Sequence, residues 1–324
     1  MNTKIQETGH NVNTREVIME NAIDIRGLTK KFDDIIAVND FNLTIQQGEM
    51  FGLVGPDGAG KTTLFRMLTG ILLPTSGEAE LLGFDLIKQT KEINKEIGYL
   101  SQRFSLYGDL TIDENIEFFA EINGVENYKE RREELLEFTR LTPFRKRLAD
   151  QLSGGMKQKL ALACTLIHKP KIIFLDEPTT GVDPVSRRDF WKILSSLLES
   201  NITIVMSTPY LDEAERCGRV ALMNQGKVMV VDTPPNIKKL MKGDLIEIVS
   251  DQIRRATTLL KGHKSVLDVQ AFGDRLNVVL ENSKRDYPVV EETLRNANIT
   301  ITERRNISPS LENIFISLMS RQNN

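Results

Sequence analysis

Residues 55–63 read GPDGAGKTT, which fits the phosphate-binding pattern G-x-x-x-x-G-K-[ST]. The apolar run EMFGLVG before them predicts a buried strand, and KTTLFRMLTG after them predicts a helix that ends near Gly70. In such a context, backbone N–H groups of a glycine-rich loop converge on phosphate groups and a lysine neutralises them. We therefore predict a nucleotide-phosphate site made by Gly55, Pro56, Asp57, Gly58, Ala59, Gly60, Lys61, Thr62 and Thr63.

A second motif, KIIFLDEP at 171–178, places two carboxylates at the end of an expected buried strand. Enzymes that transfer phosphoryl groups pair the phosphate loop with an aspartate that holds Mg²⁺ and a group that orients the attacking water. We expect Asp176 to hold Mg²⁺ through water, Thr62 to bind the ion directly, and Glu177 to orient and deprotonate the water. Two adjacent carboxylates alone would more often be a solvated turn, but the phosphate loop upstream favours the nucleotide interpretation.

A third motif, LSGGM at 152–156, lies between the other two and precedes an expected helix. With the three motifs in this order, the chain resembles the nucleotide-binding subunits of ATP-binding cassette (ABC) transporters. In that family two subunits are thought to bind head to tail, with ATP between the phosphate loop of one and the signature motif of the other. The resemblance implies that Ser153, Gly154 and Gly155 contact ATP across a dimer, where the start of a helix adds partial positive charge.

The resemblance extends to single residues and implies ATP and Mg²⁺ as cofactors. Gln102 matches the glutamine that reaches Mg²⁺ and faces the membrane partner, so Lys61, Gln102 and Glu177 are the candidate catalytic residues. Asp183, in TTGVDP, matches the loop that crosses the dimer interface. Phe32 stands where the family has an aromatic that stacks on adenine, with core packing as the alternative. Asp57 stands where asparagine is common, a difference that the sequence does not explain.

Pro209 departs from the family pattern. The switch histidine of the family lies in the context T-H-x-x-D-E-A-E, where this chain has TPYLDEAE at 208–215. Such a histidine would hydrogen bond the γ-phosphate and help to hold the water and the catalytic glutamate, whereas proline donates nothing. Loss of one donor to developing charge costs about 2.7–4 kcal/mol, or roughly 10²–10³ in rate. We therefore expect nearly intact ATP binding and slow hydrolysis, unless Thr208 or Tyr210 supplies the missing hydroxyl.

The order of expected elements indicates an α/β fold: a P-loop NTPase core of the ABC ATPase type with an inserted helical subdomain and a small C-terminal α+β domain. We expect a flexible tail over 1–20, the nucleotide-binding domain over 21–240 and the helical subdomain over about 105–155. Paired prolines in DTPPN end the core pattern. The accessory domain is expected over 244–324.

Composition narrows the possible partners. Lys and Arg total 42 against 45 for Asp and Glu, so a net charge of −3 gives no electrostatic argument for nucleic-acid binding. No apolar run approaches the roughly 18–20 residues that span a bilayer, so a role in transport requires a membrane partner. The two cysteines, Cys164 and Cys217, match no metal-binding spacing and are expected to be buried thiols.

Finer patterns, LSGGMKQKLALA and DEPTTGVDP, look like the branch that serves multidrug and sodium exporters. This resemblance implies an integral membrane permease as partner and a cytoplasmic chain lying peripherally on the inner face of the membrane. A second nucleotide-binding domain would complete the dimer, either a copy of this chain or a cassette with an intact switch histidine. The alternative is a regulatory nucleotide-binding module with little hydrolysis; a translation or DNA-repair ATPase of the same superfamily is disfavoured by the single set of motifs and the lack of basic excess.

Overall fold

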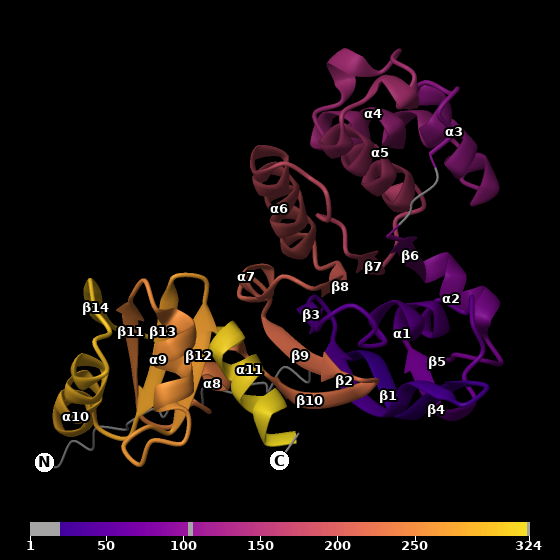
Figure 1. Cartoon of the computed structure of the whole chain (residues 1–324). Helices are drawn as coiled ribbons and strands as arrows, with labels where there is room; N and C mark the ends of the chain where they lie inside the picture. Colours follow the sequence, from indigo (N-terminus) through magenta and orange to yellow (C-terminus); the bar gives the residue numbers. More distant parts are fainter. Residues whose placement is uncertain (1–19, 103–105, 323–324) are drawn as a thin grey trace, which may run out of the picture.

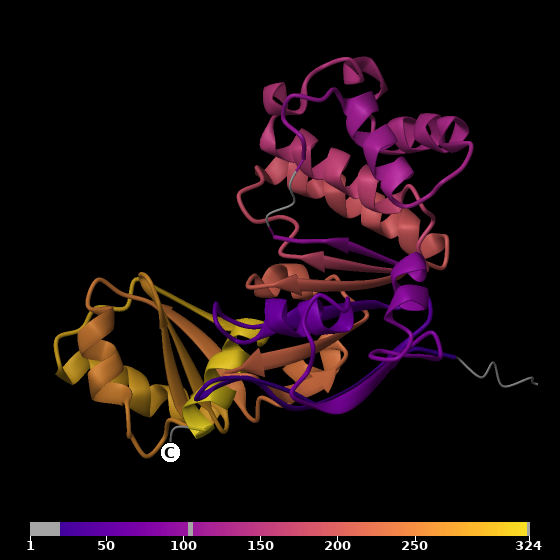
Figure 2. The same cartoon turned by 90° about the vertical axis from the view of Figure 1, so that its right-hand side faces the viewer.

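Figure 1 shows a computed structural model of the chain, which describes residues 20–102 and 106–322. A helical part, a central α/β part and a C-terminal sheet with its helices form three lobes, and the central part joins the other two (Figures 1 and 2). In the described residues no helix combines the length and the apolar character that crossing a bilayer requires.

The central sheet has the order β10-β9-β3-β8-β7-β6, and all its pairs are parallel except β10 with β9. Its strands are β3 (Met50–Val54), β6 (Ile97–Leu100), β7 (Ile172–Asp176), β8 (Thr203–Thr208), β9 (Arg219–Asn224) and β10 (Lys227–Asp232). Every residue of β3, β7 and β8 is buried, which explains the apolar runs MFGLV, IIFL and IVM in them. The predicted mostly parallel sheet of an α/β fold is confirmed.

An antiparallel sheet of order β2-β1-β4-β5 lies beside the central one. Its strands are β1 (Asn21–Phe32), β2 (Ile35–Gln46), β4 (Ser76–Leu81) and β5 (Phe84–Asp85). Helix α1 (Lys61–Leu68) shares a hydrophobic cluster with β1, β2 and β4 and with the central strands, and α2 (Thr90–Glu96) adds Ile93 to it. Thr69 and Gly70, with φ +70° at the glycine, end α1 as the sequence predicts.

The helical part consists of α3 (Ile112–Ile122), α4 (Tyr128–Phe138), two short 3₁₀ turns (Thr142–Phe144 and Ala149–Gln151) and α5 (Gly154–Leu166). Helix α3 starts with a capping box between Thr111 and Glu114. The signature helix α5 packs on α3 and α4, so the helical part continues beyond the expected boundary at 155. The helices of this part share a hydrophobic cluster, to which α6 (Pro184–Glu199) adds Phe190, Trp191 and Leu194.

The C-terminal sheet is antiparallel and has the order β12-β13-β11-β14. Its strands are β11 (Asp244–Val249), β12 (Asp268–Phe272), β13 (Arg275–Leu280) and β14 (Glu303–Ile307), and a separate cluster packs them against α9 (Ile253–Leu260) and α10 (Ser283–Asn296). Helix α10 begins five residues before Pro288, which lies inside it. The side chain of Asn282 caps the helix there by accepting from the N–H groups of Lys284 and Arg285.

The last helix, α11 (Leu311–Gln322), does not follow the expected division into two domains. Leu311 and Ile314 are 0% and 2% exposed and belong to the hydrophobic cluster that contains residues of the helices α3 to α6. Helix α11 contacts α7 (Leu211–Ala214), α8 (Pro234–Lys238) and β12. Two hydrogen bonds between buried residues join it to the C-terminal sheet: Gln270 donates to the backbone carbonyl oxygen of Asn313, and the side-chain amide of Asn313 donates to Oε1 of Gln270. The helix therefore bridges the two parts (Figure 1).

Replacing Leu311 by alanine tests this bridge. Because the side chain is fully buried, we expect Leu311→Ala to lower the free energy of unfolding by about 2–5 kcal/mol. Leu259→Ala, on α9 at a position 38% exposed, is the matched control and should cost less than about 1 kcal/mol. Equilibrium urea unfolding measures both. Equal losses in the two variants would contradict the docking of α11.

Candidate nucleotide-binding site

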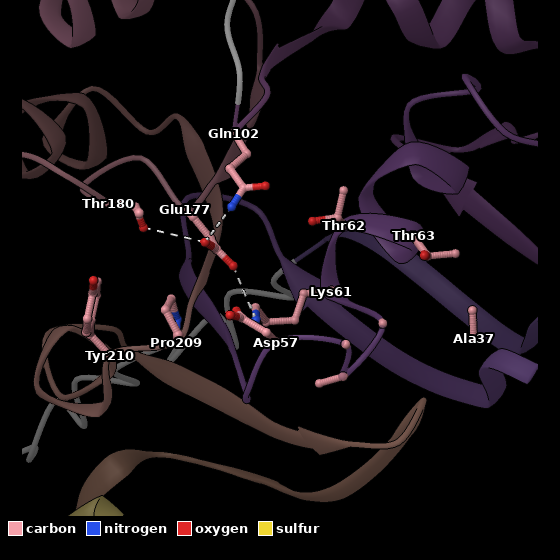
Figure 3. Close-up of a pocket in the computed structure, with 13 residues that line it drawn as sticks. Ala37, Asp57, Lys61, Thr62, Thr63, Gln102, Glu177, Thr180, Pro209 and Tyr210 are labelled. Atoms are coloured by element: carbon pink, nitrogen blue, oxygen red, sulfur yellow. Dashed lines mark hydrogen bonds and ion pairs between the residues drawn. The ribbon is translucent and has the colours of Figure 1, made fainter. Parts of the chain in front are cut away.

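The predicted site residues meet at the carboxyl edge of the central sheet. Strands β3 and β8 end together, and the N–H of Gly55 lies 3.4 Å from the carbonyl oxygen of Thr208. Beside them, Asp176 at the end of β7 pairs with Ser207 on β8. A cavity of about 760 Å³ opens there (Figure 3). It is lined by residues 57–63 and by Ala37, Gln102, Glu177, Thr180, Pro209 and Tyr210.

The backbone of the phosphate loop requires glycine at two places. A Cβ on Gly60, whose φ is +99°, would lie 2.3 Å from the carbonyl oxygen of Ala37. A Cβ on Gly55 would lie 2.3 Å from the carbonyl oxygen of Met223. Gly60 is also the N-cap of α1 and offers no side chain to the first N–H groups of the helix, so these donors face the cavity without a side-chain cap. The loop thus presents the backbone arrangement that binds anions.

Lys61 supplies the positive charge at this loop. Its side chain is 4% exposed, and its ammonium donates to the carbonyl oxygens of Gly55 (2.8 Å) and Pro56 (3.1 Å) and lies 3.4 Å from Oε1 of Glu177. These partners compensate the burial of the charge. A phosphate group in the cavity would be a further anionic partner within reach of the same ammonium.

Glu177 is held from several sides. Its backbone has φ +49°, a left-handed conformation that is uncommon for a residue with a side chain. Its N–H donates to the carbonyl oxygen (3.1 Å) and the hydroxyl (3.0 Å) of Ser207. Oε2 accepts from Nε2 of Gln102 at 2.9 Å and from the hydroxyl of Thr180 at 3.4 Å. The carboxylate is therefore oriented at the wall of the cavity, as Figure 3 shows.

The oxygen atoms near Glu177 fit a magnesium ion. Gln102 uses its amide nitrogen on Glu177, so its oxygen is left on the side of Thr62, another cavity residue (Figure 3). Asp176 is fully buried, accepts from Ser207 at 2.5 Å and from Tyr99 at 3.4 Å, and does not line the cavity, so a contact with the ion would have to pass through water. Burial and the charge of Asp176 raise the pKa of Tyr99 to about 12. Hydroxyl, amide and carboxylate oxygens are the ligands that Mg²⁺ prefers.

Pro209 lines the cavity beside Tyr210. The hydrogen bonds to the carboxylate of Glu177 come from Gln102 and Thr180, not from Thr208 or Tyr210 on either side of the proline. Thr208 is fully buried, donates to Oε2 of Glu213 at 2.9 Å and accepts from the N–H of Tyr210. The ring of Tyr210 lies 5.1 Å from the guanidinium of Arg187, beyond Pro209 as seen from Lys61 (Figure 3). The hydroxyl of Thr208 is therefore engaged in the interior rather than in the cavity.

The signature residues lie outside this cavity. Ser153 is exposed and caps α5 by accepting from the N–H of Met156, and Gly154 is exposed next to it. Asp183 caps α6, and hydrogen bonds from Ser186 and Val185 lower its pKa. A Cβ on Gly155 would lie 2.4 Å from Ser186, so the starts of α5 and α6 are in close contact. Among the described residues these groups form a second surface, separate from the phosphate loop.

Phe32 is not a core residue. Its side chain is 44% exposed at the end of β1, and the ammonium of Lys30 lies 5.0 Å from the ring centre. The core-packing alternative for this residue is therefore wrong. Phe32 does not belong to the residues that line the cavity, so its stacking on adenine stays a prediction.

The comparisons with known proteins agree with the arrangement of the motifs. The ABC transporter family matches residues 38–180. The Nod factor export ATP-binding protein I of Rhizobium sp. (strain N33) is 35% identical over 306 residues, and the match covers 93% of this chain and 98% of the relative. The chain belongs to the ATP-binding subunits of ABC transporters. The members of this family are ATPases.

Other relatives of this ABC subunit cover different shares of the chain. The probable multidrug ABC transporter ATP-binding protein YbhF of Escherichia coli (strain K12) is 43% identical over 227 residues, which is 69% of this chain but only 39% of the relative's length. A dimeric ATP-binding cassette solved in a post-hydrolysis state with ADP and Pi has a TM-score of 0.60 and 29% identity, covering 65% of this chain and 98% of the other. The part shared with both is the ATP-binding cassette.

The structure adds residues to the cassette's site that the sequence analysis missed. Ser207 connects Asp176 and Glu177, since its hydroxyl donates to the carboxylate of Asp176 and accepts from the backbone N–H of Glu177. Thr180 donates to Glu177, and Tyr99 to Asp176. The one available signal was the position of Ser207 at the end of a buried apolar strand, where a polar residue requires a partner.

Replacing Ser207 by alanine tests its role in the site. The variant loses hydrogen bonds to Asp176 and to the N–H of Glu177, and bonds to a charged group contribute about 1.5–3 kcal/mol. We expect the rate constant of Mg-ATP hydrolysis to fall about tenfold or more while the Kd for ATP changes less. Ser195→Ala, at an exposed position on α6, is the control. A Ser207→Ala variant that hydrolyses ATP like the unmodified chain would contradict this role.

Proposed function

We propose that this chain is the ATP-binding and ATP-hydrolysing subunit of an ABC-type exporter, acting through a separate membrane permease at the cytoplasmic face of the membrane. The convergence of Lys61, Gln102 and Glu177 at a phosphate-loop cavity carries the proposal. Relatives with the names multidrug transporter and Nod factor export protein support the exporter class. Export of a substrate needs the permease, since no helix of the described residues suits a membrane span.

Each residue of the site has a role in this mechanism. The loop N–H groups and Lys61 bind the phosphates, and in doing so the ammonium exchanges its contacts with the loop carbonyls and Glu177 for phosphate oxygens. Glu177 then accepts the proton of the attacking water, with its carboxylate still oriented by Gln102. Thr62, Gln102 and Asp176 would hold Mg²⁺, which neutralises charge on the phosphate oxygens.

The rate of hydrolysis in this chain is limited by Pro209. The position lines the cavity but provides no donor, and the hydroxyl of Thr208 is bonded to Glu213. Binding depends on the phosphate loop, which is complete, whereas the chemical step lacks one hydrogen bond to developing charge. ATP binding is thus retained and hydrolysis is slow.

The first experiment compares steady-state Mg-ATPase of the full chain, Pro209→His and Glu177→Gln. Restoring the donor should raise the rate constant by roughly 10²–10³. The Kd for ATP should stay within about threefold, because the phosphate loop is unchanged. Glu177→Gln, which removes the base, sets the inactive baseline. If Pro209→His leaves turnover unchanged, the limiting role of Pro209 is wrong.

A second cassette completes the functional unit in this proposal. Ser153 and Gly154 are exposed at the start of α5 and lie outside the cavity of their own chain, so they are available to the ATP of a partner. In a homodimer both sites would contain Pro209. Pairing with a cassette that has an intact switch histidine would leave one complete site, which is the arrangement that Pro209 favours.

Replacing Ser153 by arginine tests the head-to-tail contact. The larger cation blocks the exposed start of α5 but is remote from the phosphate loop. In a Glu177→Gln background we expect ATP to drive dimer formation, and Ser153→Arg to abolish it, while ATP still binds with a Kd within about threefold of the parent. Size-exclusion chromatography with light scattering measures the dimer. Unchanged dimer formation would place the contact elsewhere.

Pro209 also favours a second candidate function: a regulatory nucleotide-binding module whose ATP-bound state signals rather than drives transport. In that case ATP still binds, but turnover of the full chain is no higher than that of Glu177→Gln. The same ATPase comparison therefore separates the two functions.

A further inference from the structure

We propose that Thr180 is a positioning residue that holds the catalytic carboxylate of Glu177 in place of a switch histidine. The inference rests on the proposed ATPase function and adds to it how a site with Pro209 keeps its base oriented. Oε2 of Glu177 accepts from both Gln102 and Thr180, whereas Pro209, which also lines the cavity, provides no donor (Figure 3).

Thr180 is fixed relative to Glu177 by the backbone. Its N–H donates to the carbonyl oxygen of Glu177 at 3.2 Å, which closes a turn over residues 177–180. The turn brings the hydroxyl of Thr180 within 3.4 Å of the carboxylate of the same Glu177. Donor and acceptor therefore belong to one turn, and no movement of another element is needed to bring them together.

The turn is anchored to the protein interior at its other residues. Thr179 is buried and does not line the cavity, and its hydroxyl donates to Oε1 of the buried Glu213 at 2.5 Å. Glu213 also accepts from Thr208 and lies 3.5 Å from Nε of Arg187. With Glu177 bonded to Ser207 through its N–H, both ends of the turn are fixed. The adjacent threonines thus have different roles, since Thr179 anchors the turn and Thr180 contacts the base.

The other partners of the Glu177 carboxylate cannot orient it throughout the reaction. Lys61 lies 3.4 Å from Oε1, but the same ammonium is required by the phosphates. Gln102 donates to Oε2, but its amide oxygen is also a candidate ligand of Mg²⁺. Thr180 has no second acceptor among the described residues, so its hydroxyl stays available to the carboxylate. A bond of 3.4 Å is long, and such bonds in sites without substrate tighten in the reacting complex.

A switch histidine and Thr180 would therefore be partly redundant, which a double-mutant cycle detects. Thr180→Val removes the hydroxyl at nearly constant volume, and Thr180→Ser keeps it. In the unmodified Pro209 chain, Thr180→Val should lower the rate constant for Mg-ATP about tenfold or more with little change in KM, as expected for a hydrogen bond to a charged group. Thr180→Ser should recover most of that loss. In a Pro209→His background, the same Thr180→Val change should cost less than about twofold.

Two controls accompany the cycle, which uses the full chain throughout. Thr258→Val removes an exposed hydroxyl on α9, far from the cavity, and should leave turnover unchanged. The Kd for trinitrophenyl-ATP, measured for every variant, reports on binding separately from chemistry. A merely structural role of Thr180 would lower turnover equally in both backgrounds and would not be recovered by serine.

The outcomes separate this inference from the proposed function. A larger loss with Pro209 than with histidine, together with recovery by Thr180→Ser, supports it. Equal losses in the two backgrounds overturn it and leave the ATPase intact. Turnover in Pro209→His but none in the unmodified chain also overturns it, because Thr180 then fails to hold a working base. If neither exceeds Glu177→Gln, the ATPase proposal fails and the positioning role fails with it.

Discussion

The register of three parallel strands is the constraint on which the site depends. Val54 at the end of β3 pairs with Thr208 on β8, and Asp176 at the end of β7 pairs with Ser207. This register brings the phosphate loop and both carboxylates to one edge of the sheet, where ligands of open α/β sheets bind. Since side chains alternate along a strand, a slip of one residue between β7 and β8 would separate Asp176 from the hydroxyl of Ser207.

The parts of the fold that follow local rules could be predicted from the sequence. The phosphate loop stands between a buried strand and α1, as its flanking patterns indicate, and Glu177 follows the apolar strand β7. Three features could not be predicted in this way. Helix α10 starts at its Asn282 cap, α5 extends the helical part, and α11 packs both on the C-terminal sheet and in a cluster of the nucleotide-binding part. Each depends on packing or capping that competes with the simpler pattern.

The same distinction holds within the site. Lys61, Gln102 and Glu177 were recognisable from motifs and are in contact in the structure. Ser207 and Thr180 have no motif of their own, because their roles come from a neighbouring strand and from the closure of a turn. A serine at the end of a strand and a threonine in a turn are common everywhere. Only the position of Glu177 gives these two hydroxyls a function.

Helix α11 gives the cassette a mechanical property. It packs on α7 and α8 on one side and is joined through Asn313 to Gln270 of the C-terminal sheet on the other. Close-packed interiors resist gradual deformation and transmit displacement. Helix α7 begins two residues after Pro209 and contains Glu213, which holds Thr179 of the catalytic turn. Helix α11 therefore connects the C-terminal sheet mechanically to the site. A rotation of that sheet would displace α7 and, through Glu213, the turn that holds Glu177.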